Sequence, residues 1–276
     1  MSITSVMEPL ARIRSKQMIE LLNTGKRIDG RDLAAYRSIK VEPGFVQKAE
    51  GSAQVTLGNS RVLVGIKVAI GEPYADTPDQ AVQTVNAEFV PLAHQYFEPG
   101  PPDENSIELA RVVDRGIRES KAIDLEKLVL VRGREVYIIF IDVYILNHDG
   151  NLIDASAFAA LVALMNTKIP KYVVNADGEA VRTDEKIPLP LRDYPIPISI
   201  VKMNGKLLVD PNLEEERAAN AKITIATTQN GDICALQKSG TGAFTAEEIM
   251  TAKQIAIEKA KEIRKILSES AMNGQN

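Results

Sequence analysis

The sequence has too few cysteines and histidines to build a disulfide framework or a metal site of the usual kind. Cys234 is the only cysteine, so no internal disulfide can form, which is typical of proteins from a reducing compartment. His94 and His148 are the only histidines, and they are far apart in sequence without ligand spacing. We therefore expect no metal site. Cys234 falls in a predicted strand, which favours a small core residue.

Long apolar runs are also absent. No stretch approaches the roughly 18 apolar residues of a membrane span, and the N-terminus, MSITSVMEPLARIRSK, lacks the apolar core of a signal peptide. We expect no membrane association and a cytoplasmic location. The formal net charge is −4, so nucleic-acid binding would need a local basic patch or a partner's surface. There is no P-loop, no GxGxxG motif after a strand and no nucleophile elbow.

The pattern of strands and helices predicts mixed α+β layers. We divide the chain into an N-terminal helix (1–25), a first half (26–182) and a second half (183–276). Each half places strand hairpins before a long helix, which indicates a weak structural duplication. The crossover between the halves is rich in proline, which disfavours a helix there. Its prolines are Pro188, Pro190, Pro195 and Pro197.

Several elements can be placed by their local signals. Hairpins are predicted around Gly58-Asn59, Asn204-Gly205 and Asn230-Gly231, because these pairs favour tight turns. Residues 152–167 are apolar nearly all round, which predicts a buried helix. The last helix should open with Thr245 and Glu248, which form a capping box. We expect residues 268–276 to be a frayed tail.

One predicted helix, IELARVVDRGIRES at 107–120, carries a row of arginines. Arg111, Arg115 and Arg118 are four and three residues apart and share a face. A second face, expected to point to the core, holds Ile107, Ala110, Val113 and Ile117. The arginines could be a solvated face paired with neighbouring carboxylates. They could also be a row of forked donors along a phosphodiester backbone.

An acidic cluster precedes a predicted strand in the second half. Its members are Asp210, Glu214, Glu215 and Glu216. A magnesium site or a general acid is conceivable there. The cluster taken alone favours a solvated acidic loop.

Several stretches together resemble a known family. RIDGRDLAAYR (27–37), GSAQVTLGNSRVLVGIKV (51–68), VDPNLEEERAANAKITIA (209–226) and the capped last helix occur in the order seen in RNase PH-like phosphorolytic exoribonucleases. The match is strongest to the non-catalytic RNase PH-like subunits of the archaeal exosome core. Two further stretches carry that resemblance: FEPGPPDENSIELARVVDRGIRESKAIDLEKL (97–128) and DVYILNHDGNLIDASAFAALVALMNTKIP (142–170).

The resemblance implies an RNase PH-like fold of two pseudo-duplicated βαββα-type halves. It also implies that an active member would need an arginine pair before the first-half helix, a Gly-Thr-Arg or Gly-Ser-Arg turn for phosphate, and an aspartate before a second-half strand. This sequence has other residues at those three places. They are Glu104 and Asn105 for the arginine pair, Asn151, Leu152 and Ile153 for the turn, and Lys222 for the aspartate. We therefore expect no catalytic residue in this chain.

The same resemblance assigns partners and an RNA contact. Arg111 and Arg115 match positions that help hold RNA at a partner's active site, and Arg118 extends the row by geometry. The expected partners are a catalytic RNase PH-like subunit, alternating with this chain in a hexameric ring, RNA-binding cap subunits and a single-stranded RNA 3′ end, with no cofactor. Two alternatives remain open. The chain could be an active nuclease that uses Glu214, Glu215 or Glu216 as its acid, or a scaffold without RNA contact.

Overall fold

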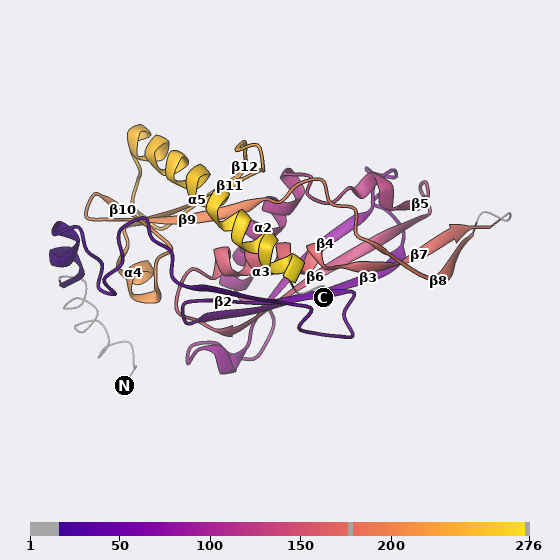
Figure 1. Cartoon of the computed structure of the whole chain (residues 1–276), viewed down its shortest axis with the longest axis horizontal. Coiled ribbons are helices and arrows are strands. Elements are labelled where there is room, and N and C mark those ends of the chain that lie inside the picture. Colours follow the sequence, from indigo (N-terminus) through magenta and orange to yellow (C-terminus); the bar gives the residue numbers. More distant parts are fainter. Residues whose placement is uncertain (1–16, 176–178, 274–276) are drawn as a thin grey trace.

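The first half of the chain builds a large mixed sheet. The computed structural model describes residues 17–175 and 179–273. The sheet has the order β1-β2-β3-β6-β4, with the short β5 also paired to β6 (Figure 1). All neighbours are antiparallel except β4 and β6, which are parallel. Its strands are β1 (Ile39–Pro43), β2 (Gly51–Leu57), β3 (Ser60–Gly71), β4 (Val82–Phe89), β5 (Val129–Val131) and β6 (Glu135–Asn147).

The second half builds a smaller, fully antiparallel sheet with the order β10-β9-β11-β12. The hairpins predicted at Gly58-Asn59, Asn204-Gly205 and Asn230-Gly231 are all confirmed. A short helix separates the two hairpins of this half. The elements are β9 (Ile196–Met203), β10 (Lys206–Val209), α4 (Leu213–Ala218), β11 (Ala221–Thr227), β12 (Ile233–Ser239) and α5 (Ala246–Asn273).

Three long helices each contact strands of both sheets, and α5 lies across the front of the molecule in the view of Figure 1. Helix α2 (Glu104–Glu119) contacts β4 and β12, α3 (Leu152–Met165) contacts β2, β3 and β9, and α5 contacts β1, β9 and β11. Because α3 has a sheet on either side, it is buried almost all round, as its apolar sequence predicted. Gly51 lets β2 approach this helix, because a Cβ there would lie 2.6 Å from the carbonyl oxygen of Ala163. The expected mixed α+β architecture is confirmed.

Helix α5 begins with the predicted capping box and runs further than predicted. The backbone N–H of Thr245 donates to Glu248, and the N–H of Glu248 donates to the Thr245 hydroxyl. The frayed tail expected from residue 268 is wrong for the described part, since the helix continues to Asn273. The reason is that Ala271 lies one turn after Leu267 and is buried like it, which extends the apolar stripe of the helix.

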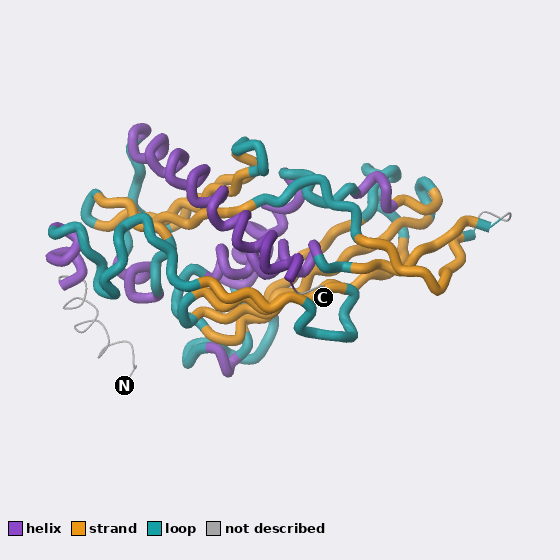
Figure 2. Tube along the Cα trace, viewed as in Figure 1, coloured by secondary structure: helices purple, strands orange, loops and turns teal. Residues whose placement is uncertain are grey.

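A two-stranded arm between the halves was not predicted. It consists of β7 (Lys168–Val174) and β8 (Ala180–Pro188) and projects beyond the large sheet (Figure 2). Strand β8 is mostly exposed and charged, so it lacks the alternation that signals a half-buried strand. The boundary that we place between residues 182 and 183 falls inside β8, and the chain enters the second half after Pro188.

The N-terminal segment packs on the smaller sheet. Residues 17–23 are helical, and the earlier part of the predicted helix, 1–16, lies outside the described residues. Met18 and Leu22 form a small apolar cluster with Val201, Met203 and Leu208. The segment ends at Gly25, whose φ of 81° is left-handed. Within the described ranges, no helix is long and apolar enough to cross a membrane.

Candidate functional site

Helix α2 forms where the sequence predicted it and carries the arginine row. Asp103 caps its start by accepting from the backbone N–H of Ser106 at 2.8 Å. The predicted core face is confirmed for Ala110, Val113 and Ile117, which are buried. Ile107 is 50% exposed, so its placement on the core face was wrong. It lies in the first turn, where most residues of the helix are exposed.

Arg118 is held by the protein itself. Its guanidinium donates to Asp114, one helical turn earlier, at 2.9 and 3.0 Å, and to the carbonyl oxygen of Gln83 at 3.1 Å. The hydrogen bond with Asp114 raises the pKa of Arg118. This arrangement matches the solvated, carboxylate-paired face that the sequence left open as an alternative.

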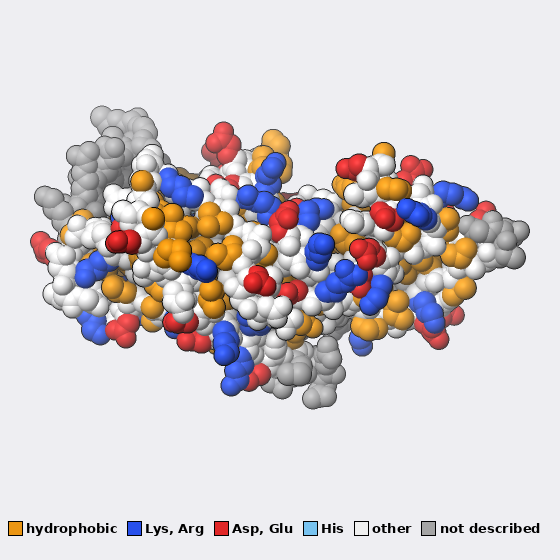
Figure 3. Space-filling view, turned by 90° about the horizontal axis from the view of Figure 1, so that it is seen from above, with side chains coloured by type: hydrophobic (Ala, Val, Ile, Leu, Met, Phe, Trp, Pro, Cys, Tyr) orange, Lys and Arg blue, Asp and Glu red, His pale blue; other side chains and the backbone are white. Residues whose placement is uncertain are grey.

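Arg111 and Arg115 are in a different situation. Both are exposed, and within residues 17–175 and 179–273 no carboxylate forms an ion pair with either of them. Arg115 donates to the side-chain oxygen of Gln237 on β12, a neutral partner. Their full positive charges are therefore available to an external anion. Figure 3 shows one face of the molecule, on which basic and acidic side chains are interspersed.

The start of α3 is where the resemblance would place a phosphate-binding turn. Asn151 precedes the helix in a left-handed conformation, and Asn151, Leu152 and Ile153 are all buried. The Asn151 amide donates to Asp154 and to Asp210, at 2.9 and 2.8 Å. Leu152 and Ile153 have no side-chain donor. The turn therefore offers no guanidinium and no hydroxyl to an anion.

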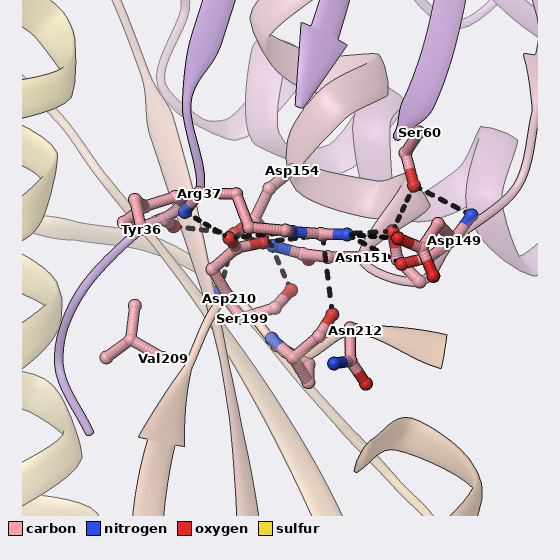
Figure 4. A network of polar contacts seen from close by, with 12 residues as sticks. Tyr36, Arg37, Ser60, Asp149, Asn151, Asp154, Ser199, Val209, Asp210 and Asn212 are labelled. Carbon is pink, nitrogen blue, oxygen red and sulfur yellow. Dashed lines mark hydrogen bonds and ion pairs between the residues drawn. The ribbon is translucent and has the colours of Figure 1, made fainter. Parts of the chain in front are cut away.

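The side chain of Arg37 lies beside this turn, next to Asp149 and Asp210 (Figure 4). Its guanidinium donates to Asp210 at 2.8 Å and to the carbonyl oxygen of Asp149 at 2.6 Å. Arg31 adds a second ion pair to the fully buried Asp210, at 3.0 Å. Gly150 closes the turn against α4, because a Cβ at this position would meet the backbone carbon of Asn212 at 2.4 Å.

The acidic cluster is structural and not a solvated loop, so that expectation was wrong. Residues 213–218 form α4, which opens with a capping box between Asn212 and Glu215. Glu215 is buried and forms a two-point ion pair with Arg27, which is equally buried. Burial of a carboxylate demands such a partner. Among the described residues, no group of three or more histidine, cysteine or acidic side chains is arranged to hold a metal.

Lys222 lies on β11 at the place where the resemblance would put an acid. Its ammonium nitrogen is 2.8 Å from a carboxylate oxygen of Glu216, and both side chains are about four-fifths covered. Burial lowers the pKa of Lys222, but Glu216, Asp154 and Glu108 raise it by more. The side chain is therefore a cation at neutral pH. A lysine ammonium can neither protonate a leaving group as a carboxylic acid does nor ligate magnesium.

Asp154 is the carboxyl group of this region whose pKa is clearly raised. It accepts hydrogen bonds from the Tyr36 hydroxyl at 2.6 Å and from the hydroxyl and backbone N–H of Ser199 at 2.8 and 3.0 Å. Burial outweighs these donors and raises the pKa of Asp154 to about 6. The network joins the N-terminal segment, α3 and β9 into one unit.

Sequence reasoning missed the long-range ion pairs of three arginines and the contact between the two histidines. The motif RIDGRDLAAYR carries Arg27, Arg31 and Arg37, but nothing local shows that they reach across the chain to Asp210 and Glu215. His94 and His148 also come together, with ring centroids 5.2 Å apart. Burial lowers the pKa of His148 to about 4, so this ring is neutral at pH 7.

Comparison with known proteins matches this architecture. A family model described as the 3′ exoribonuclease family, domain 1, matches residues 35–170, and the model of its domain 2 matches residues 193–259. The chain belongs to the RNase PH family of 3′ exoribonucleases. The RNase PH-like fold expected from the sequence is thereby confirmed, with one family domain in each half.

Relatives within the RNase PH family are similar over nearly the full length. The exosome complex component Rrp42 of Thermococcus gammatolerans is 54% identical over 267 residues, which cover 96% of this chain and 98% of the relative. A chain of the Archaeoglobus fulgidus exosome with RNA bound to the active site superposes with a TM-score of 0.86 at 46% identity, covering 93% of this chain and 98% of that chain. A chain of an archaeal exosome core gives 0.84 at 41% identity, covering 95% and 99%. The resemblance to archaeal exosome subunits is confirmed.

The first prediction concerns the buried ion pair. Replacing Arg27 by Ala leaves Glu215 buried and unpaired, so the free energy of unfolding should fall by about 3–5 kcal/mol. The matched control is Lys26→Ala, because the ion pair of Lys26 with Asp32 is exposed and should be worth about 1 kcal/mol or less. Urea unfolding of the two variants measures the difference. Equal losses of stability would show that the buried Arg27–Glu215 pair contributes no more than the exposed Lys26–Asp32 pair.

The second prediction concerns pH. Because the pKa of Asp154 is about 6 in the folded chain and about 4 in an unfolded one, the folded state binds more protons between these values. Its stability must then fall as the pH rises from 4 to 6, by roughly 3 kcal/mol from this group. Asp154→Asn removes that contribution. In denaturant titrations, the free energy of unfolding of the wild type minus that of the variant should decline from pH 4 to pH 6. A constant difference would contradict the raised pKa of Asp154.

Proposed function

We infer that the chain is the non-catalytic RNase PH-like subunit of an archaeal exosome. It takes part in 3′–5′ phosphorolytic degradation of RNA without performing the cleavage itself. The observation that carries this conclusion is the chemistry of the turn before α3 and of Lys222 on β11. The phosphate turn is replaced by buried Asn151, Leu152 and Ile153, and the acid is replaced by the Lys222–Glu216 ion pair. The curated relatives, which are named as exosome components, support the same conclusion.

The partners follow from this proposal. The chain would pair with a catalytic RNase PH-like subunit, and three such pairs would alternate in a hexameric ring with RNA-binding cap subunits. The ring would act in the cytoplasm on the single-stranded 3′ end of RNA. The similarity to a chain of an exosome with RNA bound supports an RNA-degrading assembly of this kind.

The arginine row of α2 is the proposed RNA contact. Arg111 and Arg115 are favoured because both are exposed and neither is neutralised by a carboxylate of the described residues. Guanidinium groups suit phosphate because their donors form a planar fork. Arg118 is the weaker member, since Asp114 already engages it. Arg118 would favour RNA binding only through the positive electrostatic potential that it adds near the other two arginines.

The two alternatives differ in their support. An active nuclease that uses Glu214, Glu215 or Glu216 as its acid is disfavoured for two of the three, because Glu215 is paired with Arg27 and Glu216 with Lys222. Glu214 lies in the first turn of the same short helix, α4. A scaffold without RNA contact is favoured only by the internal pairing of Arg118. Crosslinking of RNA to the assembled ring, followed by peptide mapping, separates that scaffold from the proposal.

The third prediction tests the RNA contact. Replacing Arg111 and Arg115 by Ala in the assembled ring should weaken RNA binding and slow degradation, because two phosphate contacts are lost. Each lost contact should also flatten the salt dependence of binding by roughly one unit of log–log slope. RNA affinity measured at several salt concentrations, together with the size of the ring, checks this.

The control for that experiment removes the same charge elsewhere. Arg132 and Arg134 are exposed on the turn between β5 and β6. Replacing both by Ala should leave the RNA affinity and the salt slope near those of the wild type. If the Arg111 and Arg115 variant behaved like this control in an intact ring, the RNA assignment would be wrong.

The fourth prediction tests whether phosphorolytic activity can be restored by one change. Lys222→Asp returns a carboxylate to β11, but the turn at Asn151 to Ile153 still offers no phosphate donor. The variant without a partner should therefore release no nucleoside diphosphates from RNA and phosphate. Measurable phosphorolysis by the single variant would contradict the loss of the phosphate site.

A further inference from the structure

Five aromatic rings form a continuous row that joins the end of β4 to the turn before α3. The row runs through Phe89, Phe97, His148, His94 and Tyr96, and consecutive ring centroids are 4.7 to 5.5 Å apart. These separations are those of attractive aromatic pairs. Both histidines of the sequence are in this row, so a chain with few aromatic residues gathers its rings here.

The row begins at the core and ends at the surface. Phe89 and Phe97 are partly buried and pack against the main hydrophobic cluster. Tyr96, at the other end, is 48% exposed. Leu92, in the short helix η1 (Pro91–Ala93) that precedes these residues, is also exposed. The outermost ring is therefore supported from behind by other rings and is open to an external ligand.

Each histidine of the row is a neutral ring with one N–H group to offer. The Nδ1 atom of His94 accepts from the backbone N–H of Tyr96 at 3.4 Å, and that of His148 accepts from the N–H of Gly150 at 3.3 Å. A nitrogen that accepts carries no proton, so the proton of each neutral ring is on Nε2. Burial lowers the pKa of both histidines, which keeps them uncharged at pH 7.

The same tautomer argues against a metal ion between the two rings. A histidine that ligates a metal through Nε2 usually donates its Nδ1–H to a carbonyl or carboxylate oxygen. Here the Nδ1 atoms of His94 and His148 accept from backbone N–H groups instead. The Nε2–H groups are therefore suited to an acceptor, such as an oxygen or ring nitrogen of a ligand.

Arg217 of α4 adds a positive charge at the exposed end of the row. Its guanidinium carbon lies 5.8 Å from the centre of the Tyr96 ring, which is a cation–π distance. Arg217 is exposed, and no carboxylate in the described part of the chain forms an ion pair with it. The nearby Asp149 and Glu216 are paired with other cations of the chain. The charge of Arg217 is therefore available to an anion.

An exposed ring, neutral donors and an unpaired guanidinium together match the needs of single-stranded RNA. A base of any sequence can stack on an aromatic side chain, and the phosphate that follows it needs a cation. The Nε2–H groups can donate to the acceptors of a base or a ribose. A purely apolar peptide segment would use the rings but not the donors or the charge.

We propose that Tyr96, His94 and Arg217 form a base-stacking site for single-stranded RNA. In this site a base packs on the aromatic row at Tyr96, and the adjacent phosphate meets Arg217. The site lies on other elements than the arginine row of α2, whose Arg115 reaches Gln237 of β12. The inference rests on the proposed function, since it gives an RNA-degrading assembly a second contact with its substrate on this chain.

The fifth prediction tests the stacking. Tyr96→Ala should weaken binding of the purified chain to a single-stranded RNA oligonucleotide by roughly tenfold, because one stacked base is lost. Tyr96→Phe keeps the ring and should bind like the wild type. Phe45→Ala, which removes a similarly exposed ring between β1 and β2, should also leave the affinity unchanged. Fluorescence anisotropy measures the affinities, and thermal melts verify that each variant folds.

An oligonucleotide of the same length without bases separates stacking from charge. Tyr96→Ala and the wild type should bind this abasic strand equally, because no base can stack. Arg217→Ala should flatten the salt dependence of RNA binding by roughly 0.7 of a log–log unit, the value for one phosphate of a single strand. Arg182→Ala removes an exposed arginine of β8 and should leave the slope unchanged.

A photocrosslinking amino acid at Tyr96 of the assembled ring identifies the occupant. The proposal predicts crosslinks to RNA, and crosslinks to protein alone would overturn it. If Tyr96→Ala binds RNA as tightly as the wild type while the wild-type ring degrades RNA, the stacking site is overturned and the proposed function stands. A wild-type ring that released no nucleoside diphosphates from RNA would instead overturn the proposed function.

Discussion

The buried carboxylate of Asp210 is the constraint on which the centre of the molecule depends. It has no exposure to solvent and is held by ion pairs with Arg31 and Arg37 and by the amide of Asn151. A carboxylate can be buried at acceptable cost only if such partners surround it. These partners come from the N-terminal segment and from the turn before α3. The need to neutralise one charge therefore ties three distant parts of the sequence together.

This neutralisation also limits what the residues around Asp210 can bind. Arg37 donates hydrogen bonds to Asp210 and to the carbonyl oxygen of Asp149, and Lys222 forms an ion pair with Glu216. The positive charges of Arg37 and Lys222 in this region, which could have met a phosphate, are satisfied internally. The guanidiniums of Arg111 and Arg115, which no carboxylate of the described residues neutralises, lie on α2. The turn before α3 and Lys222 are thus unsuited to bind a reacting phosphate, and the proposed RNA contact lies on α2.

Much of the fold could be predicted because its signals are local. Asn-Gly turns fixed the second-half hairpins, an all-apolar segment indicated the helix between the sheets, and Thr245 with Glu248 marked the start of α5. The β7–β8 arm was missed because β8, which is mostly exposed and charged, has no apolar alternation. The end of α5 was misplaced because Ala271, a small residue in a polar tail, is buried only by tertiary packing.

The candidate site was predictable in part. The arginine spacing on α2 and the unsuitable residues at Asn151 to Ile153 and at Lys222 can be read directly from the sequence. The partners of Arg27, Arg37 and Glu215 could not be, because each pairing spans more than a hundred residues. Local patterns do not distinguish a paired buried carboxylate from a solvated one. This is why the acidic stretch around α4 was expected to be a loop.

The most direct test of the central claim uses the purified chain alone. It would be incubated with RNA and inorganic phosphate, and the products would be examined for nucleoside diphosphates, with the chain plus its catalytic partner as the positive control. The account predicts nucleoside diphosphates only in the presence of the partner. Their release by the isolated chain would contradict it.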